Sequence, residues 1–409
     1  MAVADGVGLV DHPSRLPAQE TAGINLSRHF CQHKSNSLFL GNSRTKDSAL
    51  FGVIAGILVG GAGHTNAVAA LCTALSADAP LVLLSGHAGL SEIGRGAFQE
   101  LRQADMAEPV TKASWTARSA ASLGHDLAKA VRIATSGRPG PVHLSLPIDL
   151  LEEMLADRPE LWPAPDAFAA SAQPLSAAAA EAVLVALAAA ERPLILAGPM
   201  LCHPPAAMLQ SRLAASTGVP VIGMESPRGI NDPRHGALAE ILARADLVVL
   251  FGKPHDFTLK FADPPAVAAG CRFIVVDPEA AMVERVVREK GARVLLATVA
   301  DAAAAATALI ERTERTHTAS AWMAEVAAAI RFRPPAWAGL ASAPGAWVHP
   351  VELCRALVPY VEGKGYPVLV CDGGEIGQWP QATLDPARRL INGVAGSIGA
   401  SIPFAIAAS

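Results

Sequence analysis

A glycine-rich turn is the first stretch of the sequence whose residue types could support chemistry. It reads Gly60-Gly-Ala-Gly-His-Thr-Asn66 and follows an apolar run. Gly61 and Gly63 carry no side chain, so the backbone there can approach a ligand closely. Thr65 or Asn66 could cap a following helix, whose first N–H groups would point into the same space and attract a phosphate. Taken alone, the turn is weak evidence, because ordinary strand-to-helix connections also use glycine.

Further motifs with groups suited to a site follow the turn in order. Ala97-Phe-Gln-Glu100 comes after a loop rich in glycine and serine, and Pro109-Val-Thr-Lys112 comes next. Gly137-Arg-Pro-Gly-Pro-Val142 then leads into His143-Leu-Ser-Leu-Pro147. The Pro-Gly-Pro turn restricts the backbone just before residues 143–147 and so favours a strand there.

Two more glycine turns lie near the other end of the sequence. Asp372-Gly-Gly374 ends an apolar run that resembles a strand, and Gly396-Ser-Ile-Gly399 opens an apolar helix. Both turns offer backbone N–H groups that a phosphate could reach. By itself, Ile398 would be interpreted as a core residue at the start of a helix.

Buried strands and helices must position these turns. The apolar runs 53–59 and 80–86 are short enough for strands buried on both faces, and an Ala/Leu segment with helical spacing lies between them. A strand, a glycine turn, a helix and a strand form a βαβ unit, and such units build parallel sheets. We also predict a helix over 123–134 that ends at Ser136-Gly137, and a strand over 142–146 in which apolar residues alternate with others.

The composition is that of a large α/β protein. The 409 residues suffice for two or three domains, and 51% hydrophobic with 17% charged residues fits doubly covered parallel sheets rather than disorder. A formal net charge of −4 gives no electrostatic basis for binding nucleic acid or an anionic membrane. No signal peptide opens the sequence, and the Ala-rich run 175–190 is interrupted by Glu181, so no membrane span is expected. Six scattered cysteines without a Cys-x-x-Cys pair predict buried free thiols in a reducing cytoplasm.

Composition also divides the chain. We predict a divergent N-terminal segment at 1–50, α/β units at 51–165, 175–315 and 346–409, the last of them incomplete, and a linker at 316–345. Buried strands are predicted in the middle unit at 193–198, 219–222, 247–252 and 272–277. Asp277 ends the last strand, where an acid could hold a ribose hydroxyl but more commonly caps the next helix. No Gly-x-Gly-x-x-Gly fingerprint accompanies it.

The ordered motifs resemble those of thiamine diphosphate-dependent enzymes of the acetolactate synthase type. These enzymes carry a Gly-Pro-Gly-x-x-Asn turn, then Phe-Gln-Glu, then Pro-[Ile/Val]-Thr-Lys, then Gly-Arg-Pro-Gly-Pro-Val before a strand. The resemblance is specific because four separate elements agree in order and spacing. It implies an α/β fold of parallel-sheet, three-layer units: a pyrimidine-binding-type domain, a central Rossmann-like domain and the start of a diphosphate-binding domain.

The resemblance also implies roles for individual residues. Gln99 matches a catalytic amide near the thiazolium ring, and Phe98 matches a wall of the substrate pocket. Ile398 matches the apolar side chain under the bend of the cofactor. The residues implied to bind the cofactor are Gly61, Gly63, Asn66, Gly373, Gly374, Gln378, Gly396, Ser397 and Ile398.

The implied reaction is decarboxylation of a 2-keto acid followed by carboligation. The implied cofactor is thiamine diphosphate with Mg²⁺, and some members of the family also bind FAD or ADP in the central unit. The cofactor lies between the N-terminal unit of one chain and the C-terminal unit of another, which implies a homodimer or homotetramer.

Two parts that this reaction needs are not found in the sequence. The glutamate that activates the cofactor would fall in the middle thirties, where the sequence reads His33-Lys-Ser-Asn-Ser-Leu38, and the only glutamate before Gly61 is Glu20. The metal motif, Gly-Asp-Gly followed by Asn, is expected on a strand after the helix that begins at Ala400, so a sequence cut short is expected and no metal ligand is assigned. The N-terminus is either divergent or wrongly started, or the chain is a catalytically silent relative.

Three functions remain open at this stage. The first is an acetolactate synthase-like enzyme. The second is an oxalyl-CoA decarboxylase or 2-hydroxyacyl-CoA lyase, which shares these motifs but acts on an acyl-CoA substrate. The third is a non-catalytic protein that keeps the fold for binding or assembly, favoured by the missing glutamate and metal motif.

Overall fold

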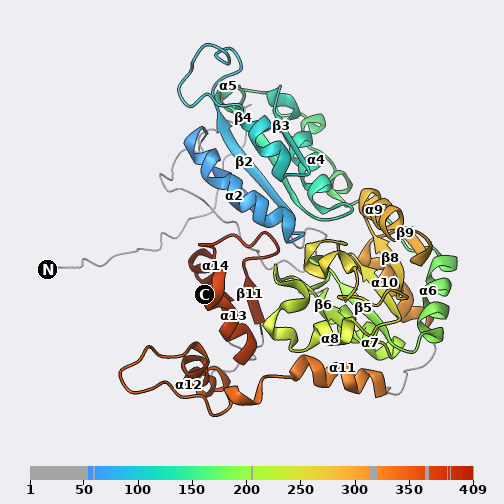
Figure 1. Cartoon of the computed structure of the whole chain (residues 1–409). Coiled ribbons are helices and arrows are strands. Elements are labelled where there is room, and N and C mark those ends of the chain that lie inside the picture. The colour runs from blue at the N-terminus through green and yellow to red at the C-terminus, as the bar shows by residue number, and fades with distance from the viewer. Residues whose placement is uncertain are drawn as a thin grey trace.

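Three α/β units follow one another along the chain (Figure 1). The computed structural model describes residues 54–58, 60–203, 206–313, 321–363, 368–384, 386 and 388–408. Every strand pair in it is parallel. This confirms the predicted fold class, a chain of parallel-sheet α/β units.

The N-terminal unit is a four-stranded sheet with helices on both faces. Its strand order is β1-β2-β4-β3, and its elements are β1 (Ile54–Leu58), α2 (Ala62–Ser76), β2 (Leu81–His87), α3 (Gln103–Ala107), β3 (Ala113–Thr116), α4 (Leu123–Thr135), β4 (Pro141–Pro147) and α5 (Ile148–Glu152). Leu83 packs against Leu71 of α2, whereas Val82 and Val142 pack against α4. Successive residues of a strand point to opposite faces, so α2 and α4 cover opposite sides of this sheet.

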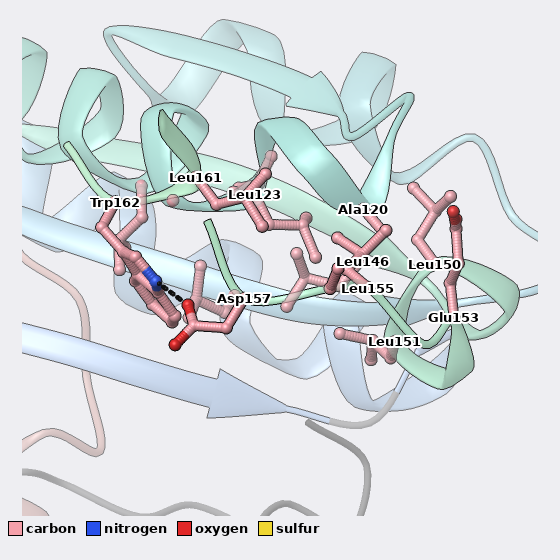
Figure 2. Close-up of a pocket in the computed structure, with 15 residues that line it drawn as sticks. Ala120, Leu123, Leu146, Leu150, Leu151, Glu153, Leu155, Asp157, Leu161 and Trp162 are labelled. Atoms are coloured by element: carbon pink, nitrogen blue, oxygen red, sulfur yellow. Dashed lines mark hydrogen bonds between the residues drawn. The ribbon is translucent and has the colours of Figure 1, made fainter. Parts of the chain in front are cut away.

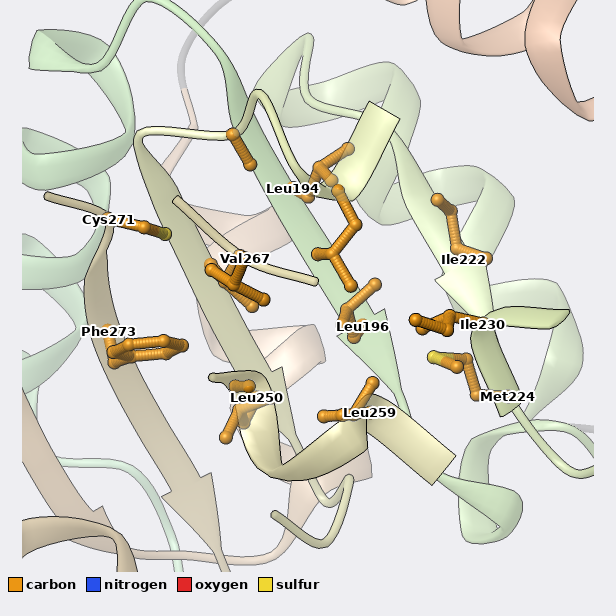
Figure 3. Packing of buried hydrophobic residues seen from close by; sticks show 14 of the residues in the cluster. Leu194, Leu196, Ile222, Met224, Ile230, Leu250, Leu259, Val267, Cys271 and Phe273 are labelled. Atoms are coloured by element: carbon orange, nitrogen blue, oxygen red, sulfur yellow. The ribbon is translucent and has the colours of Figure 1, made fainter. Parts of the chain in front are cut away.

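The central unit is a five-stranded sheet with the order β6-β5-β7-β8-β9. Its elements are α6 (Ala177–Ala189), β5 (Pro193–Ala197), α7 (Ala207–Thr217), β6 (Val221–Gly223), α8 (Leu238–Leu242), β7 (Leu247–Phe251), β8 (Arg272–Asp277), α9 (Ala280–Lys290), β9 (Val294–Val299), α10 (Ala302–Arg312) and α11 (Ala321–Arg331). The four strands predicted here are confirmed, and β9 is an addition to them. Figure 3 shows one side of the core, a single cluster to which Leu196, Leu250 and Phe273 of the strands and Met224 and Leu259 of the connecting segments belong.

Helix α11 belongs to the core of the central unit, although it lies in the segment 316–345 that was predicted to be a linker. Trp322 donates its indole N–H to the Pro193 carbonyl at 2.9 Å, and Val326 is buried in the same cluster as Leu194. An apolar face with helical spacing therefore docks this segment on the sheet.

The C-terminal unit contains α12 (Pro350–Glu362), β10 (Val368–Cys371), α13 (Gly374–Thr383), β11 (Arg388–Ile391) and α14 (Ser401–Ala408). β10 and β11 form a two-stranded parallel sheet. Arg389 ties this unit to the central one through a 2.7 Å ion pair with Glu225.

A buried ion cluster joins the N-terminal unit to the central unit. Arg138 donates to both carboxylate oxygens of Asp78 at 2.8 Å and also bonds Asp277. Burial raises the pKa of both carboxyls, and the Arg138 guanidinium opposes that rise. Asp277 also accepts the Glu279 N–H just before α9. The same carboxylate therefore stabilises the start of this helix and the contact between the two units.

The described cysteines are all free thiols. Burial raises the pKa of Cys271 to about 12, so this thiol is inert at neutral pH. The prediction of buried thiols is wrong for Cys72, which lies on an exposed position of α2. Among the described residues, no helix is both long and apolar enough to cross a bilayer.

Candidate functional site

The glycine turn before α2 holds a backbone shape that excludes side chains. Gly61 has a φ of 57°, and a Cβ there would lie 2.9 Å from the Cβ of Gln99. A Cβ at Gly60 would lie 2.4 Å from the Gly86 carbonyl oxygen. The glycines are therefore required by close packing against the neighbouring strand end and loop.

Helix α2 begins earlier than the sequence suggested. It starts at Ala62, its N-cap is Gly61, and no side chain caps it. Thr65 lies inside the first turn and donates its hydroxyl to the Ala62 carbonyl, and Asn66 is exposed on the helix. The prediction that Thr65 or Asn66 caps this helix is wrong, and the first backbone N–H groups stay without a side-chain cap.

Gln99 contacts the glycine turn from a loop whose backbone N–H groups are bonded to one glutamate. Glu100 accepts the N–H groups of Gly94 at 2.6 Å, Gly96 at 3.0 Å and Ala97 at 3.1 Å. These bonds, that of Gly94 first, hold the pKa of Glu100 below its ordinary value. Gln99 itself has a φ of 59°, a strained shape for a residue with a side chain. The loop thus presses Gln99 against Gly61.

Phe98 lies beside Gln99 and is 88% exposed. Its ring therefore makes no wall within this chain alone. A second molecule or a ligand would have to cover it before it could line a substrate pocket.

A buried polar network supports the turn from behind, and the sequence analysis missed it. The Gln103 amide accepts the Gly61 N–H at 2.8 Å and donates to Gly86 at 3.0 Å and to Ser145 at 3.1 Å. Ser145 lies 3.4 Å from His143, whose other ring nitrogen meets Ser114 at 2.8 Å. One amide thus connects the turn to the ends of two strands.

Two imidazoles complete this network. His64 of α2 contacts Ser85 at 2.9 Å, and its ring centroid lies 4.5 Å from that of His143. Burial lowers the pKa of His143 to about 3 and also lowers that of His64, so both rings are neutral at pH 7. Two neutral imidazoles can lie this close, here with their planes tilted by 50°, without charge repulsion.

We expect Gln103→Met to destabilise the protein by about 1–3 kcal/mol, because it leaves the Gly61 N–H and the Gly86 carbonyl buried without partners. Chemical denaturation at pH 7 would measure the free energy of unfolding. Asn66→Ala, on the exposed side of α2, is the control and should change it by less than about 0.5 kcal/mol. Equal effects of the two substitutions would show that Gln103 does not support the turn.

The second group of predicted residues gathers around Asp372. Its carboxylate accepts the N–H groups of Gly373 and Gly399, both at 2.8 Å, and the Ser401 hydroxyl at 3.0 Å. The first of these bonds contributes most to holding the pKa of Asp372 below its ordinary value. An ionised Asp372 thus clamps the turn after β10 to the start of α14.

Ile398 and the nearby glycines form one surface with this turn. A Cβ at Gly373 would lie 3.1 Å from Ile398 and 2.7 Å from the amide nitrogen of Asn392, which donates to the Ser397 carbonyl. Ile398 is 79% exposed, which disagrees with the interpretation of a core residue. Two of the predicted glycines, Gly374 (φ 75°) and Gly396 (φ 67°), have positive φ, and the half-buried Gln378 lies one turn into α13.

The two groups of residues lie at opposite ends of α2. Ser397 accepts the Thr73 hydroxyl at 2.9 Å, and the Ala395 N–H bonds Ser76 at 3.1 Å, both near the C-terminal end of that helix. Gly61 precedes its N-terminal end. A helix of 15 residues rises about 20 Å, so a single chain does not bring Gly61 and Ile398 together. Within one chain, the predicted site residues thus form two separated groups, the candidate half-sites.

The half-sites fit some parts of the implied cofactor and not others. The N–H groups of Gly61, Gly373 and Gly399 are already donated to Gln103 and Asp372, so the turns offer a ligand close approach to the backbone. Exposed Ile398 suits an apolar surface. No group of three or more His, Cys, Asp or Glu side chains suited to a metal occurs in the described part of the chain. The sequence also contains no Gly-Asp-Gly, so no described residue is assigned to Mg²⁺.

Comparison with known proteins agrees with the motifs. Residues 17–106 match the family described as thiamine pyrophosphate enzyme, N-terminal TPP binding domain, and this range includes Gly61 and Gln99. It begins within the segment 1–50 that was predicted to be divergent. The glutamate expected in the middle thirties falls outside the described residues.

Three relatives illustrate the range of similar proteins. An oxalyl-CoA decarboxylase of Escherichia coli is 29% identical over 54% of this chain and 41% of its own length. A 2-hydroxyacyl-CoA lyase of Oryza sativa is 26% identical over 88% of this chain and 66% of its own. A probable acetolactate synthase of Mycobacterium bovis is 27% identical over 92% of this chain and 68% of its own. The chain thus spans less than half of the first relative and about two thirds of the other two.

The family match covers the glycine turn and the Gln99 loop, and the similarity to acetolactate synthase extends over nearly the whole chain. The chain is therefore similar to thiamine diphosphate-dependent enzymes, acetolactate synthases among them.

Proposed function

We propose that the chain acts in thiamine diphosphate-dependent decarboxylation of a 2-keto acid with carboligation, together with a glutamate and Mg²⁺ ligands for which its sequence shows no matching motif. The observation that carries this proposal is the Gly61 turn, whose N–H is bonded to Gln103 and whose backbone packs against Gln99. Bound thiamine diphosphate would supply the electron sink for decarboxylation. The backbone at Gly61 would orient the ring, Gln99 would offer its amide nearby, and Ile398 would support the bend.

The two half-sites require two copies of the chain. Gly61 and Ile398 are separated by the length of α2 within one copy, whereas a second copy could place its Ile398 turn against the first copy's Gly61 turn. Both half-sites expose large apolar side chains, at Phe98 and Ile398, which a monomer would leave in water. A two-fold dimer would cover both.

We expect the protein to be a homodimer or larger at micromolar concentration, as measured by light scattering. Ile398→Asp would bury a charge in the interface and weaken association by at least about tenfold. Met208→Asp on α7, an exposed apolar position of the central unit, is the control and should leave association unchanged. A soluble wild-type monomer would remove the proposal of a shared site.

A second function is favoured by the similarity to oxalyl-CoA decarboxylase and 2-hydroxyacyl-CoA lyase, and it would use an acyl-CoA substrate. A chimera separates the two. Residues 1–53 would be exchanged for the matching segment of the Mycobacterium relative, and that relative's continuation would follow Ser409. Acetolactate formed from pyruvate supports the first function. Turnover of oxalyl-CoA alone supports the second, and an inactive but folded chimera supports a non-catalytic role.

FAD or ADP in the central unit remains a proposal that rests on resemblance. The strand order reverses between β5 and β7, where doubly wound sheets bind nucleotides. Gly198 and Gly252 lie against each other there, and Arg138 donates to the Gly252 carbonyl at 3.3 Å. Flavin or ADP released by denaturing the purified protein would support a bound nucleotide, and release of neither would remove the proposal.

A further inference from the structure

The loop that carries Gln99 is held at its base by a histidine whose two ring nitrogens both face carbonyl oxygens. His87 is the last residue of β2 and is half-buried. Its Nδ1 lies 3.0 Å from the carbonyl oxygen of Ala88, and its Nε2 lies 2.9 Å from that of Leu101. Ala88 begins the loop and Leu101 is near its end, so one ring connects the two ends.

These two contacts determine which form of the ring fits. A carbonyl oxygen only accepts hydrogen bonds, and a neutral imidazole has a single N–H. The neutral ring would therefore place the lone pair of its other nitrogen against a carbonyl oxygen. The protonated ring has two N–H groups and satisfies both oxygens, and bonds from a charged donor are stronger than bonds from a neutral one. The two distances thus fit the protonated form of His87.

The titratable groups that interact with His87 come from the loop, from α2 and from β4. Backbone N–H groups, that of Gly94 first, and then the charge of His87 lower the pKa of Glu100, so this carboxylate stays ionised and attracts a cation. His64 of α2 and His143 of β4 also interact with His87, but burial is the larger effect and lowers the pKa of both. They are neutral at pH 7 and do not repel a charged ring.

Helix α5 holds the loop near its start. Asp149, in the first turn of this helix, accepts the Leu90 N–H at 2.7 Å. The next two residues, Leu150 and Leu151, line an apolar pocket (Figure 2). The start of the loop is therefore fixed by a contact that does not involve His87.

The other end of the loop is held at the Leu101 carbonyl. This oxygen accepts the Gln103 N–H at 2.7 Å and also faces the Nε2 of His87. The charges next to it, Arg102 and Asp105, form an exposed ion pair with each other at 2.7 Å. The contact with His87 is thus the one at this end that changes when the ring loses its proton.

We propose that His87 is a positioning residue that holds the Gln99 loop in place when its ring is protonated and loosens the loop when the proton is lost. Loss of the proton removes one of the two N–H donors, so one carbonyl is released. Gln99 and the backbone N–H groups bonded to Glu100 lie between the two carbonyls. The consequence for Gln99 rests on the proposed function, whereas the loop itself can be followed without cofactor or substrate.

Amide hydrogen exchange on the full chain tests this inference. Histidine side chains generally change charge between about pH 5 and pH 8, where Glu100 stays ionised. After correction for the intrinsic exchange rate, the amides of Gly94, Gly96 and Ala97 should be about three- to tenfold better protected at pH 5.5 than at pH 8, the effect of one net hydrogen bond. Equal protection at the two pH values would overturn the proposal.

Two variants assign the effect to one side chain. His87→Gln keeps an amide donor for one carbonyl and cannot gain a proton, so protection of the loop should be low and the same at both pH values. His125→Gln is the matched control, because this exposed histidine contacts the Glu160 carbonyl, outside the loop, and the dependence on pH should remain. A dependence that survives His87→Gln would belong to another group, such as His64, and would overturn the assignment.

Nitrogen-15 NMR of the wild-type ring is a second measurement, which does not require a variant to fold. Two protonated nitrogens in the His87 ring at pH 5.5 and one at pH 8 are expected. A ring with one protonated nitrogen at pH 5.5, in a protein whose loop is protected from exchange, would show that the loop does not need the charged form.

Discussion

Mixed with thiamine diphosphate and Mg²⁺, the 409-residue chain should bind the cofactor weakly, without dependence on Mg²⁺, and should release no CO₂ from pyruvate. The diphosphate carries most of the cofactor's charge, and Asp372 already accepts the N–H groups of Gly373 and Gly399, so little at this turn would neutralise that charge without a metal. The missing glutamate would lower the rate by a further factor of about 10² to 10⁴. Calorimetry and a CO₂-release assay measure the two parts of this prediction.

Thiamine without the diphosphate is the matched ligand. The ring-side turn at Gly61 is present and the metal is not, so thiamine and thiamine diphosphate should bind with similar affinity. Micromolar, Mg²⁺-dependent binding of the diphosphate form would mean that a metal site exists in this chain. Turnover of pyruvate above background would mean that another group, such as Glu20, does the work of the glutamate.

Replacing Arg138 by Met should destabilise the protein by about 3–5 kcal/mol at pH 8, because Asp78 and Asp277 would stay buried without a counter-charge. Burial already raises the pKa of both carboxyls, and removing the guanidinium raises each further. The folded state then holds protons that the unfolded state releases. The loss is therefore smallest near pH 4, the ordinary pKa of an aspartate, and grows as pH rises through the raised values.

Urea denaturation of Arg138→Met at pH 5 and pH 8 would show this dependence. Arg102→Met is the matched control, because the ion pair of Arg102 with Asp105 is exposed to solvent and should contribute less than about 1 kcal/mol. An effect of Arg138→Met that is the same at both pH values would contradict the role of the buried carboxylates.

Local patterns predicted the order of strands and helices in the first two units. The apolar runs gave β1, β2, β5 and β7 within a few residues, because a short run bounded by glycine or proline suits a buried strand. β9 was missed since Val-Leu-Leu-Ala-Thr-Val also suits a helix, and neither length nor period separates the two.

The polar network behind the turn could not be recognised from alternation. His143 and Ser145 occupy the positions in β4 that a half-exposed strand gives to solvent, yet all seven residues of β4 are buried because α2 covers that face. A histidine on α2 in the first turn after the glycines was the available signal. Likewise, the separation of the half-sites depends on the contact of Thr73 with Ser397, residues 324 positions apart, which no local pattern contains.

Helix α2 has a further consequence for a dimer with two shared sites. Its first turn borders one site through Gly61, and its last turn holds the Ser397 loop that borders the other. In such a dimer, this single helix of about 20 Å would connect the two proposed sites. If binding at one site moved α2 along its axis, the residues at the other site would move as well. Such coupling favours half-of-the-sites kinetics, in which the two sites turn over alternately.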